Sequence, residues 1–178
     1  MPTDRLALWW LWASEIVIFG GLLMSYVMHR IGHPEWAKQA AHTNQSMGLT
    51  NTFVLLTSSL AAVVAHRHAQ LGNGRAAAKF LGLTILGGIA FATIKFGLEW
   101  PHEIKEGFVP QSSGFWSFYY VACGLHAAHV IAGATVMGIV ALDARKGKDL
   151  QRVELVGIYW HFVDVVWIFL FPLLYIAK

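Results

Sequence analysis

Long apolar stretches separated by short polar segments dominate this chain of 178 residues. A bilayer core of about 30 Å needs roughly 20 residues of helix, which rises 1.5 Å per residue. Five stretches reach that length: residues 6–29, 50–68, 76–100, 115–142 and 153–176. Gly and Pro punctuate the segments between them, as is typical of turns. The pattern predicts an all-α fold, in which residues 1–178 form a single transmembrane domain, an integral membrane bundle of five helices.

The amino-acid composition supports a membrane protein and excludes several other classes. Hydrophobic residues make up 56% of the chain and charged residues 13%, whereas soluble domains carry roughly 25% charged residues. The single cysteine, Cys123, excludes an internal disulfide and a CxxC-type metal site. The net charge of +3 is scattered without a dense basic run, so we expect no nucleic-acid partner. The first stretch is too long for the apolar core of a signal peptide and contains Glu15, so we expect it to be a span.

Lys and Arg are unevenly distributed between the two ends of the expected helices. Short cytoplasmic loops carry an excess of these residues. The side that holds the N-terminus and the loops after the second and fourth helices has eight: Arg5, Arg67, Arg75, Lys79, Arg145, Lys146, Lys148 and Arg152. The opposite side has four: Arg30, Lys38, Lys105 and Lys178. We therefore expect a cytoplasmic N-terminus and a C-terminus outside, with Glu103 in an outer loop.

Small residues recur at four-residue intervals in three of the stretches. The first stretch has Gly21 and Ser25. The third has Thr84, Gly88 and Ala92, and the fourth has Gly124, Ala128 and Ala132. Helices associate in lipid through close packing of small side chains. These positions are therefore expected to lie at helix contacts and to carry no chemistry.

Several ionisable side chains lie at depths where a membrane helix is normally apolar. A charge at the bilayer centre costs roughly 2.5–3.5 kcal/mol, so such groups usually face inward and pair. We expect a buried polar or proton-related network, and no catalytic residue. Within it, Lys95 and Glu99 are one helical turn apart and can neutralise each other. The members are Glu15, Lys95, Glu99, His126, His129, His161 and Asp164, of which the three histidines and Asp164 are expected to share hydrogen bonds that connect the last helices.

The histidines raise the alternative of a bound metal or haem. A di-iron site in a bundle uses several Glu and a Glu-x-x-His motif on each of two helices, which this chain does not supply. Two bis-His haems would need four histidines at two depths, which the spacing does not supply either. We expect no metal-binding or cofactor-binding residue on this chain. Structural hydrogen bonding and proton buffering beside a partner remain open as roles for these groups.

The order of the motifs resembles that of a known family. The run Tyr159–Phe171, YWHFVDVVWIFLF, closely resembles the last-helix signature of subunit III of haem-copper oxidases of the cytochrome c oxidase type. The segment Gly124–Gly133, GLHAAHVIAG, resembles the Gly-x-His-Gly-x-His-Val motif of the preceding helix. Further similar positions, in the same order over nearly the whole chain, are Ser14-Glu15, Asn51–Ser59, Glu99-Trp100 and Glu154.

This resemblance implies a non-redox, non-catalytic subunit of a respiratory terminal oxidase. Such a subunit supports oxygen reduction, proton uptake and the stability of the catalytic subunit in aerobic electron transport. Haems and copper would lie in the partner subunits I and II, and this chain would bind none, although it could hold phospholipid. Glu15 would be the family's intramembrane carboxylate, and the complex would lie in a bacterial cell (inner) membrane.

Three departures from the family pattern leave alternatives open. The usual member has seven helices, whereas this chain has five, which match the third to the seventh, so one wall of the family's lipid-filled cleft is missing. Ala127 replaces a Gly of the His motif. Lys95 and the segment Phe171–Tyr175 resemble short relatives associated with nitric oxide reductases. An accessory membrane subunit of a nitric oxide reductase is therefore one alternative, and a stand-alone transporter or haem-binding membrane protein is another.

Overall fold

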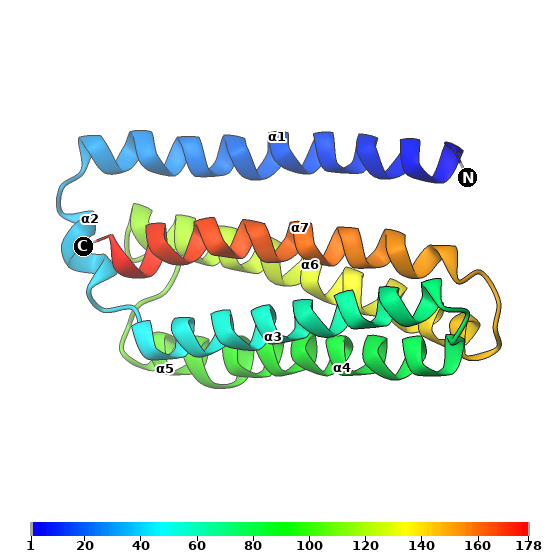
Figure 1. Ribbon diagram of the computed structural model, residues 1–178. Coiled ribbons are helices and arrows are strands. Elements are labelled where there is room, and N and C mark those ends of the chain that lie inside the picture. Colours follow the sequence, from blue (N-terminus) through cyan, green and yellow to red (C-terminus); the bar gives the residue numbers. More distant parts are fainter. Residues whose placement is uncertain (1, 178) are drawn as a thin grey trace.

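The computed structural model describes residues 2–177, and the side chains of residues 6–177. Its elements are helices joined by short turns (Figure 1). Five helical segments are long and apolar enough to cross a membrane: Leu6–Gly32, Gln45–Gln70, Gly74–Lys105, Gly114–Arg145 and Gln151–Ile176. The predicted all-α membrane bundle is thereby confirmed. Each observed segment contains the predicted stretch, and all but the last also extend past its C-terminal end, because a helix continues beyond the apolar core into the polar interface.

Several shorter elements interrupt this simple pattern. The first helix, α1 (Pro2–Gly32), is followed by the short α2 (Trp36–Ala40) and then by α3 (Gln45–Gln70). The third span consists of α4 (Gly74–Thr93), a π-helical segment η1 (Ile94–Glu99) and α5 (Trp100–Lys105). It is followed by α6 (Gly114–Arg145), α7 (Gln151–Phe171) and a second π-helical segment, η2 (Pro172–Ile176).

Side-chain caps define where three of the spans begin. The side chains of Asn44 and Asn73 each accept a hydrogen bond of 3.1 Å from the backbone N–H three residues later, at the starts of α3 and α4. Ser113 does the same for α6, over 3.4 Å. Such caps satisfy backbone donors that have no partner within the first helical turn. The helix starts therefore follow from local sequence, within a few residues of the predicted boundaries.

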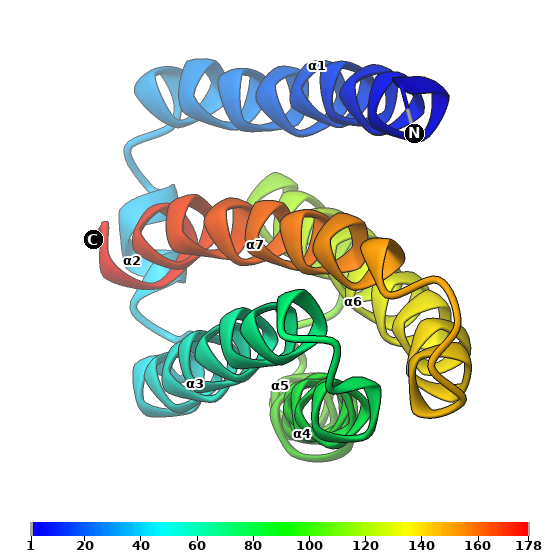
Figure 2. The ribbon, with the colours of Figure 1, turned by 45° about the vertical axis from the view of Figure 1, so that its right-hand side comes forward.

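The helices pack as a compact group of four with α1 beside it. The helix α3 lies along α4, α4 lies along α6, and α7 lies between α3 and α6. Figure 2 shows α1 set apart from this group, on the side of α6 and α7. In the apolar part of the first span, 11% of the residues are buried, against 50% in that of the final span. The first helix is therefore the most loosely held of the five.

A tryptophan of α7 fills the centre of the four-helix group. A Cβ at Gly88 of α4 would lie 2.8 Å from the ring of Trp160, and a Cβ at Gly133 of α6 would lie 2.8 Å from the neighbouring ring of Tyr159. The indole Nε1 of Trp160 donates a hydrogen bond of 3.0 Å to Ser58 Oγ in α3. Two glycines and one hydroxyl thus admit the aromatic rings of α7 into the bundle.

The predicted contacts of small residues are present in the third span. In the fourth span they are present only at Gly124, where a Cβ would lie 3.6 Å from the ring of Trp100, and at Gly21 of the first span a Cβ would have no heavy atom within 4 Å. Gly88 lies at a helix contact, as expected, and Thr84 Oγ1 donates to the carbonyl of Ser58 over 3.2 Å. In α6, however, Ala128 and Ala132 are exposed. The contact face of α6 includes Gly133 instead. Small size alone does not identify the face, because alanine is equally compatible with lipid.

Basic side chains gather at one end of the bundle, which we call the basic end. It contains the N-terminus and the turns at residues 71–73 and 146–150, whereas α2, α5 and the C-terminus lie at the opposite end (Figure 1). The excess of Lys and Arg at this end is the basis for the predicted cytoplasmic N-terminus. The side chain of Arg5 and residue Lys178, which entered that count, lie outside the part of the chain that the structure describes.

Candidate functional sites: two buried polar clusters

A lysine and a glutamate are completely enclosed near the end of the third span. Lys95 and Glu99 have no exposed surface, and Lys95 Nζ lies 3.1 Å from Glu99 Oε1. Both belong to η1, the π-helical segment, whose wider turn is often found at functional sites. The predicted pairing of these two residues one turn apart is therefore present, inside a local distortion that the sequence pattern did not indicate.

Three more side chains complete what we call the lysine cluster: Glu103 of α5, Tyr119 of α6 and Tyr175 of η2. Tyr119 Oη lies 2.9 Å from Lys95 Nζ and 2.8 Å from carboxylate oxygens of both Glu99 and Glu103. Tyr175 donates to Glu99 Oε1 over 2.5 Å and also accepts from Lys95. The cluster therefore connects the third, fourth and fifth spans at one depth.

The hydrogen bonds of the lysine cluster can be counted. An ammonium group has three donors, and Lys95 contacts the two tyrosine hydroxyls and Glu99. One oxygen each of Glu99 and Glu103, Oε2, is buried without a hydrogen-bond partner among the described residues. The cluster thus holds one cation and two carboxyl groups, in a place where uncompensated charge is costly.

Glu103, Tyr119 and Tyr175 were not among the predicted site residues. Glu103 was expected in an outer loop, but its exposed fraction is 1%. A signal was available: Lys95, Glu99 and Glu103 recur every four residues, which is the spacing of one helix face. The expectation was wrong because the third span continues to Lys105, five residues beyond its predicted end.

A second polar pair lies between α1 and α6. Glu15 Oε2 is 2.9 Å from His129 Nε2, an ion-pair contact and not a well-aligned hydrogen bond. His129 Nδ1 lies 2.7 Å from the carbonyl oxygen of Leu125. Because a carbonyl only accepts, Nδ1 carries a proton and Nε2 is the atom that can gain or lose one toward Glu15. The side chains retain some exposure, 9% for Glu15 and 19% for His129.

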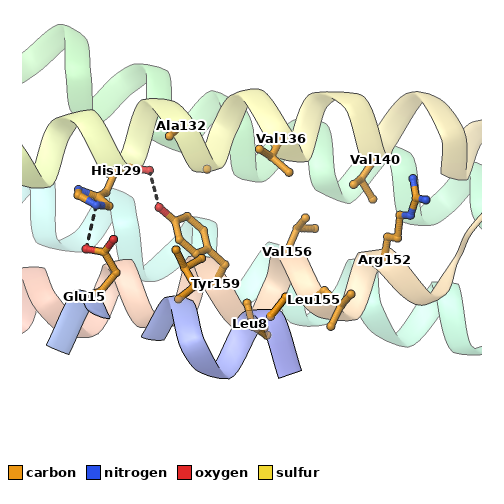
Figure 3. Close-up of a pocket in the computed structure, with 13 residues that line it drawn as sticks. Leu8, Glu15, His129, Ala132, Val136, Val140, Arg152, Leu155, Val156 and Tyr159 are labelled. Carbon is orange, nitrogen blue, oxygen red and sulfur yellow. Dashed lines mark hydrogen bonds and ion pairs between the residues drawn. The ribbon is translucent and has the colours of Figure 1, made fainter. Parts of the chain in front are cut away.

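A cavity of about 680 Å³ adjoins this pair, between α1, α6 and α7. Figure 3 shows Glu15 and His129 facing each other at one end of it, with Arg152 at the other. Tyr159 lies beside the pair and donates a hydrogen bond of 3.4 Å to the backbone carbonyl of His129. Most of the remaining lining is aliphatic, for example Leu8 and Val136.

The expected hydrogen-bond network of His126, His129, His161 and Asp164 is not formed among the described residues. His129 pairs with Glu15, whereas the ring of His161 lies 2.6 Å from Ser59 Oγ of α3. His126 is enclosed by the rings of Phe91 and Trp167, and neither of its nitrogens has a hydrogen-bond partner in residues 6–177. Neither carboxylate oxygen of Asp164 has one there either. His126 and His129 point into different helix contacts, whereas His161 and Asp164 both lie beside Ser59 of α3.

The histidines do not converge on a common point that could hold a metal ion. His126 and His129 follow each other at an interval of three residues, yet one faces Phe91 and the other faces Phe19 and Glu15. Within the described residues there is no group of three or more His, Cys, Asp or Glu side chains with the arrangement of a metal site. The geometry supports pairing and proton exchange as the chemistry of these groups.

Comparison with known proteins gives a consistent family. The family described as cytochrome c oxidase subunit III matches residues 6–178. A cytochrome c oxidase subunit 3 of Corynebacterium diphtheriae is 35% identical, over 93% of this chain and 84% of that protein. The corresponding protein of Bacillus subtilis is 30% identical, over 96% and 84%. A heme-copper oxidase subunit I+III of Aeropyrum pernix is 31% identical, over 99% of this chain and 23% of that protein.

These names do not favour the alternative of a nitric oxide reductase subunit. The match extends over both polar clusters and over the whole set of spans. The chain belongs to the cytochrome c oxidase subunit III family and is a subunit III of a haem-copper oxidase.

Proposed function

We propose that this subunit III supports oxygen reduction without holding an electron carrier, by stabilising the catalytic subunit and sustaining its proton uptake. The observation that carries the proposal is the Glu15–His129 pair, which can share a proton beside a cavity. A pair at this depth can bind and release a proton without the cost of an isolated buried charge. The lysine cluster, by contrast, has the enclosed and multiply bonded character of a structural element.

The test of this proposal is turnover of the complete oxidase complex carrying Glu15→Gln. The amide keeps the size of the side chain but cannot take up a proton as a carboxylate does. We expect a lower rate of oxygen consumption or earlier inactivation, with the haem and copper content unchanged. Ser14→Ala, an exposed neighbour on the same helix, is the matched control. Equal turnover of Glu15→Gln and Ser14→Ala would refute a proton role for Glu15.

Subunit I, and with it subunit II, is the proposed partner. The Aeropyrum pernix relative supports this choice, because its name joins subunits I and III in one protein and this chain matches 23% of it. Haems and copper would then lie in the partner subunits. Purification in mild detergent through a tag on this chain should recover these subunits together with a haem spectrum. Recovery of the chain alone, under conditions that preserve the oxidase, would contradict the proposed partnership.

The cavity between α1, α6 and α7 is a proposed site for a phospholipid. Its aliphatic lining suits acyl chains, and Arg152 lies at the end where a headgroup phosphate would be placed. Lipid extraction from the purified complex, compared between the native chain and Arg152→Gln, tests this site through the phospholipid retained per complex.

We further propose a bacterial cell (inner) membrane as the location, with the basic end facing the cytoplasm. The excess of Lys and Arg at that end supports this orientation. A cysteine placed at Gly147, in a chain whose Cys123 is replaced by Ser, should react with an impermeant thiol reagent only after the cells are opened. A cysteine placed at Gly107, at the opposite end, should react in intact cells. The reverse pattern would refute the orientation.

A further inference from the structure

A second cavity, separate from both polar clusters, lies at the basic end between the start of α4 and the end of α6. Its volume is about 800 Å³. Four of the six residues that line it are cations: Arg75 and Lys79 of α4, and Arg145 and Lys146 of α6. A smaller neighbouring cavity of about 360 Å³, on the turn side, is lined by three of the same cations. Basic side chains from two helices therefore converge on one place.

The backbone brings these cations together at close range. Gly74 is the first residue of α4, and a Cβ at this position would lie 2.1 Å from the carbonyl oxygen of Ala144 in α6. Only a glycine permits such an approach of two helix ends. Arg75 follows Gly74 directly, and Arg145 follows Ala144. The contact thus fixes two like charges beside each other.

The nearby carboxylates do not neutralise this group. Asp143 and Asp149 both face Arg152, at 4.0 Å and 3.5 Å. None of the four cations that line the cavity forms an ion pair within residues 6–177. The excess of Lys and Arg at cytoplasmic ends explains their number. It does not explain why they surround a common cavity with no acidic partner among the side chains of residues 6–177.

The helix faces below the cations are apolar and exposed. On α4 the face that carries Arg75 and Lys79 continues, at helical intervals, with Leu83 and Leu86, whose exposed fractions are 53% and 60%. On α6 the face that carries Lys146 continues with Leu142 and Ile139 in the same way. Leu142 itself lines the cavity. Positive charge at the membrane surface above exposed apolar helix faces matches a phospholipid better than a free anion.

From this arrangement we propose that the cavity between α4 and α6 binds the phosphate headgroup of an anionic phospholipid, whose acyl chains lie along the exposed leucines below. Basic pockets between membrane helices on the cytoplasmic side are suited to such headgroups. Inorganic phosphate shares the headgroup chemistry but would not contact the apolar helix faces. This site is distinct from the cavity beside Glu15 and does not depend on the proposed role in proton uptake.

The experiment is native mass spectrometry of the full chain in neutral detergent, titrated with phosphatidylglycerol, phosphatidylcholine or inorganic phosphate. The test variant is Lys79→Gln with Arg145→Gln. The control is Arg67→Gln with Lys148→Gln, which removes two exposed cations from the same end but outside the cavity. Each cation near an anionic lipid strengthens binding about fivefold, so the test pair should weaken phosphatidylglycerol binding about thirtyfold. The control should leave this binding unchanged.

Several results would overturn the proposal. Equal weakening in both pairs would show general charge attraction without a site. Equal binding of phosphatidylcholine would exclude recognition of an anionic headgroup. Displacement of phosphatidylglycerol by an equal concentration of inorganic phosphate would show a phosphate site without a lipid. If the test pair fails to fold, Lys79→Arg with Arg145→Lys keeps the charges, and it should bind phosphatidylglycerol as the native chain does.

Discussion

Removing the ammonium group of Lys95 is the sharpest test of the lysine cluster. In Lys95→Met the side chain keeps its length and loses its charge, so the space remains filled. Glu99 then loses its cation and Tyr175 loses a donor, while the hydrogen bond from Tyr175 to Glu99 remains. Breaking a buried pair by removing one partner costs about 3–5 kcal/mol, because the remaining charge is left without compensation. We expect a loss of this size in the free energy of unfolding.

A double-mutant cycle separates the pairing from the loss of packing. Glu99→Gln removes the charge of the partner, and combining it with Lys95→Met removes both charges at once. Residues in direct contact show coupling energies of about 0.5–3 kcal/mol, and a fully buried pair should lie in the upper part of this range. The control is the exposed pair His102–Glu106 near the end of the same span. His102 Nε2 lies 3.4 Å from Glu106 Oε1, and each side chain is about half exposed. An exposed pair contributes about 0–1 kcal/mol.

The assay is reversible unfolding of the chain in mixed detergent micelles, followed by tryptophan fluorescence. Trp167 lies close to the cluster, with its ring centre 5.6 Å from Lys95 Nζ, so its emission should report local unfolding. The reasoning is refuted if the coupling in the buried pair is no larger than that in the exposed pair. It is also refuted if Lys95→Met unfolds with the same free energy as the native chain.

Three further predictions concern the packing of the bundle. Gly88→Leu places a side chain against the central indole ring, so it should lower the free energy of unfolding by about 1–3 kcal/mol in the same assay. A Cβ at Gly82 would have no heavy atom within 4 Å, so Gly82→Ala should change this free energy little. Ser58→Ala leaves the buried indole N–H without its acceptor and should cost about 1–3 kcal/mol, measured as a lower unfolding midpoint. Glu15→Leu removes the ion pair between α1 and α6, so a spin label on α1 should gain mobility, while Ser14→Ala leaves the label unchanged.

The general architecture could be predicted from the sequence because it depends on local properties. Apolar length decides which segments span the membrane, and residues such as Asn44 and Asn73 decide where helices begin. The partners of the buried polar groups could not be predicted in this way. Helical periodicity indicates that Lys95 and Glu99 share a face, but not that Tyr175, 80 residues along the chain, faces them. Pairing across helices is set by tertiary packing.

The π-helical segment explains part of this difficulty. A regular α-helix has 3.6 residues per turn, and pattern arguments extrapolate that period along the whole span. The wider turn of η1 inserts additional backbone per turn, so the faces before and after it are no longer in register. Counting from α4 therefore does not give the face of positions in α5, and Glu103 aligns only with Lys95 and Glu99, which belong to η1 itself.

The histidines were expected to contact each other because they lie at a similar depth in the membrane, and this inference was wrong. His126 and His161 lie on facing helices, but one is enclosed by aromatic rings and the other contacts Ser59 of α3. A helix offers several directions at one depth, and the four-helix group uses different ones for different neighbours. Among residues 6–177, the contact between Glu15 and His129 is the one that joins two of the predicted site residues from different spans, and it involves the most loosely packed helix.

Accessibility assigns different roles to the two polar clusters. A proton can reach the lysine cluster only if the bundle opens locally, because Lys95 and Glu99 are fully enclosed. Glu15 and His129 adjoin a cavity, and Glu15 belongs to the helix that packs least against the others. A change at Lys95 should therefore lower stability before it alters turnover of the oxidase. A change at Glu15 should alter turnover before it lowers stability, and the opposite order in the two variants would contradict this division of roles.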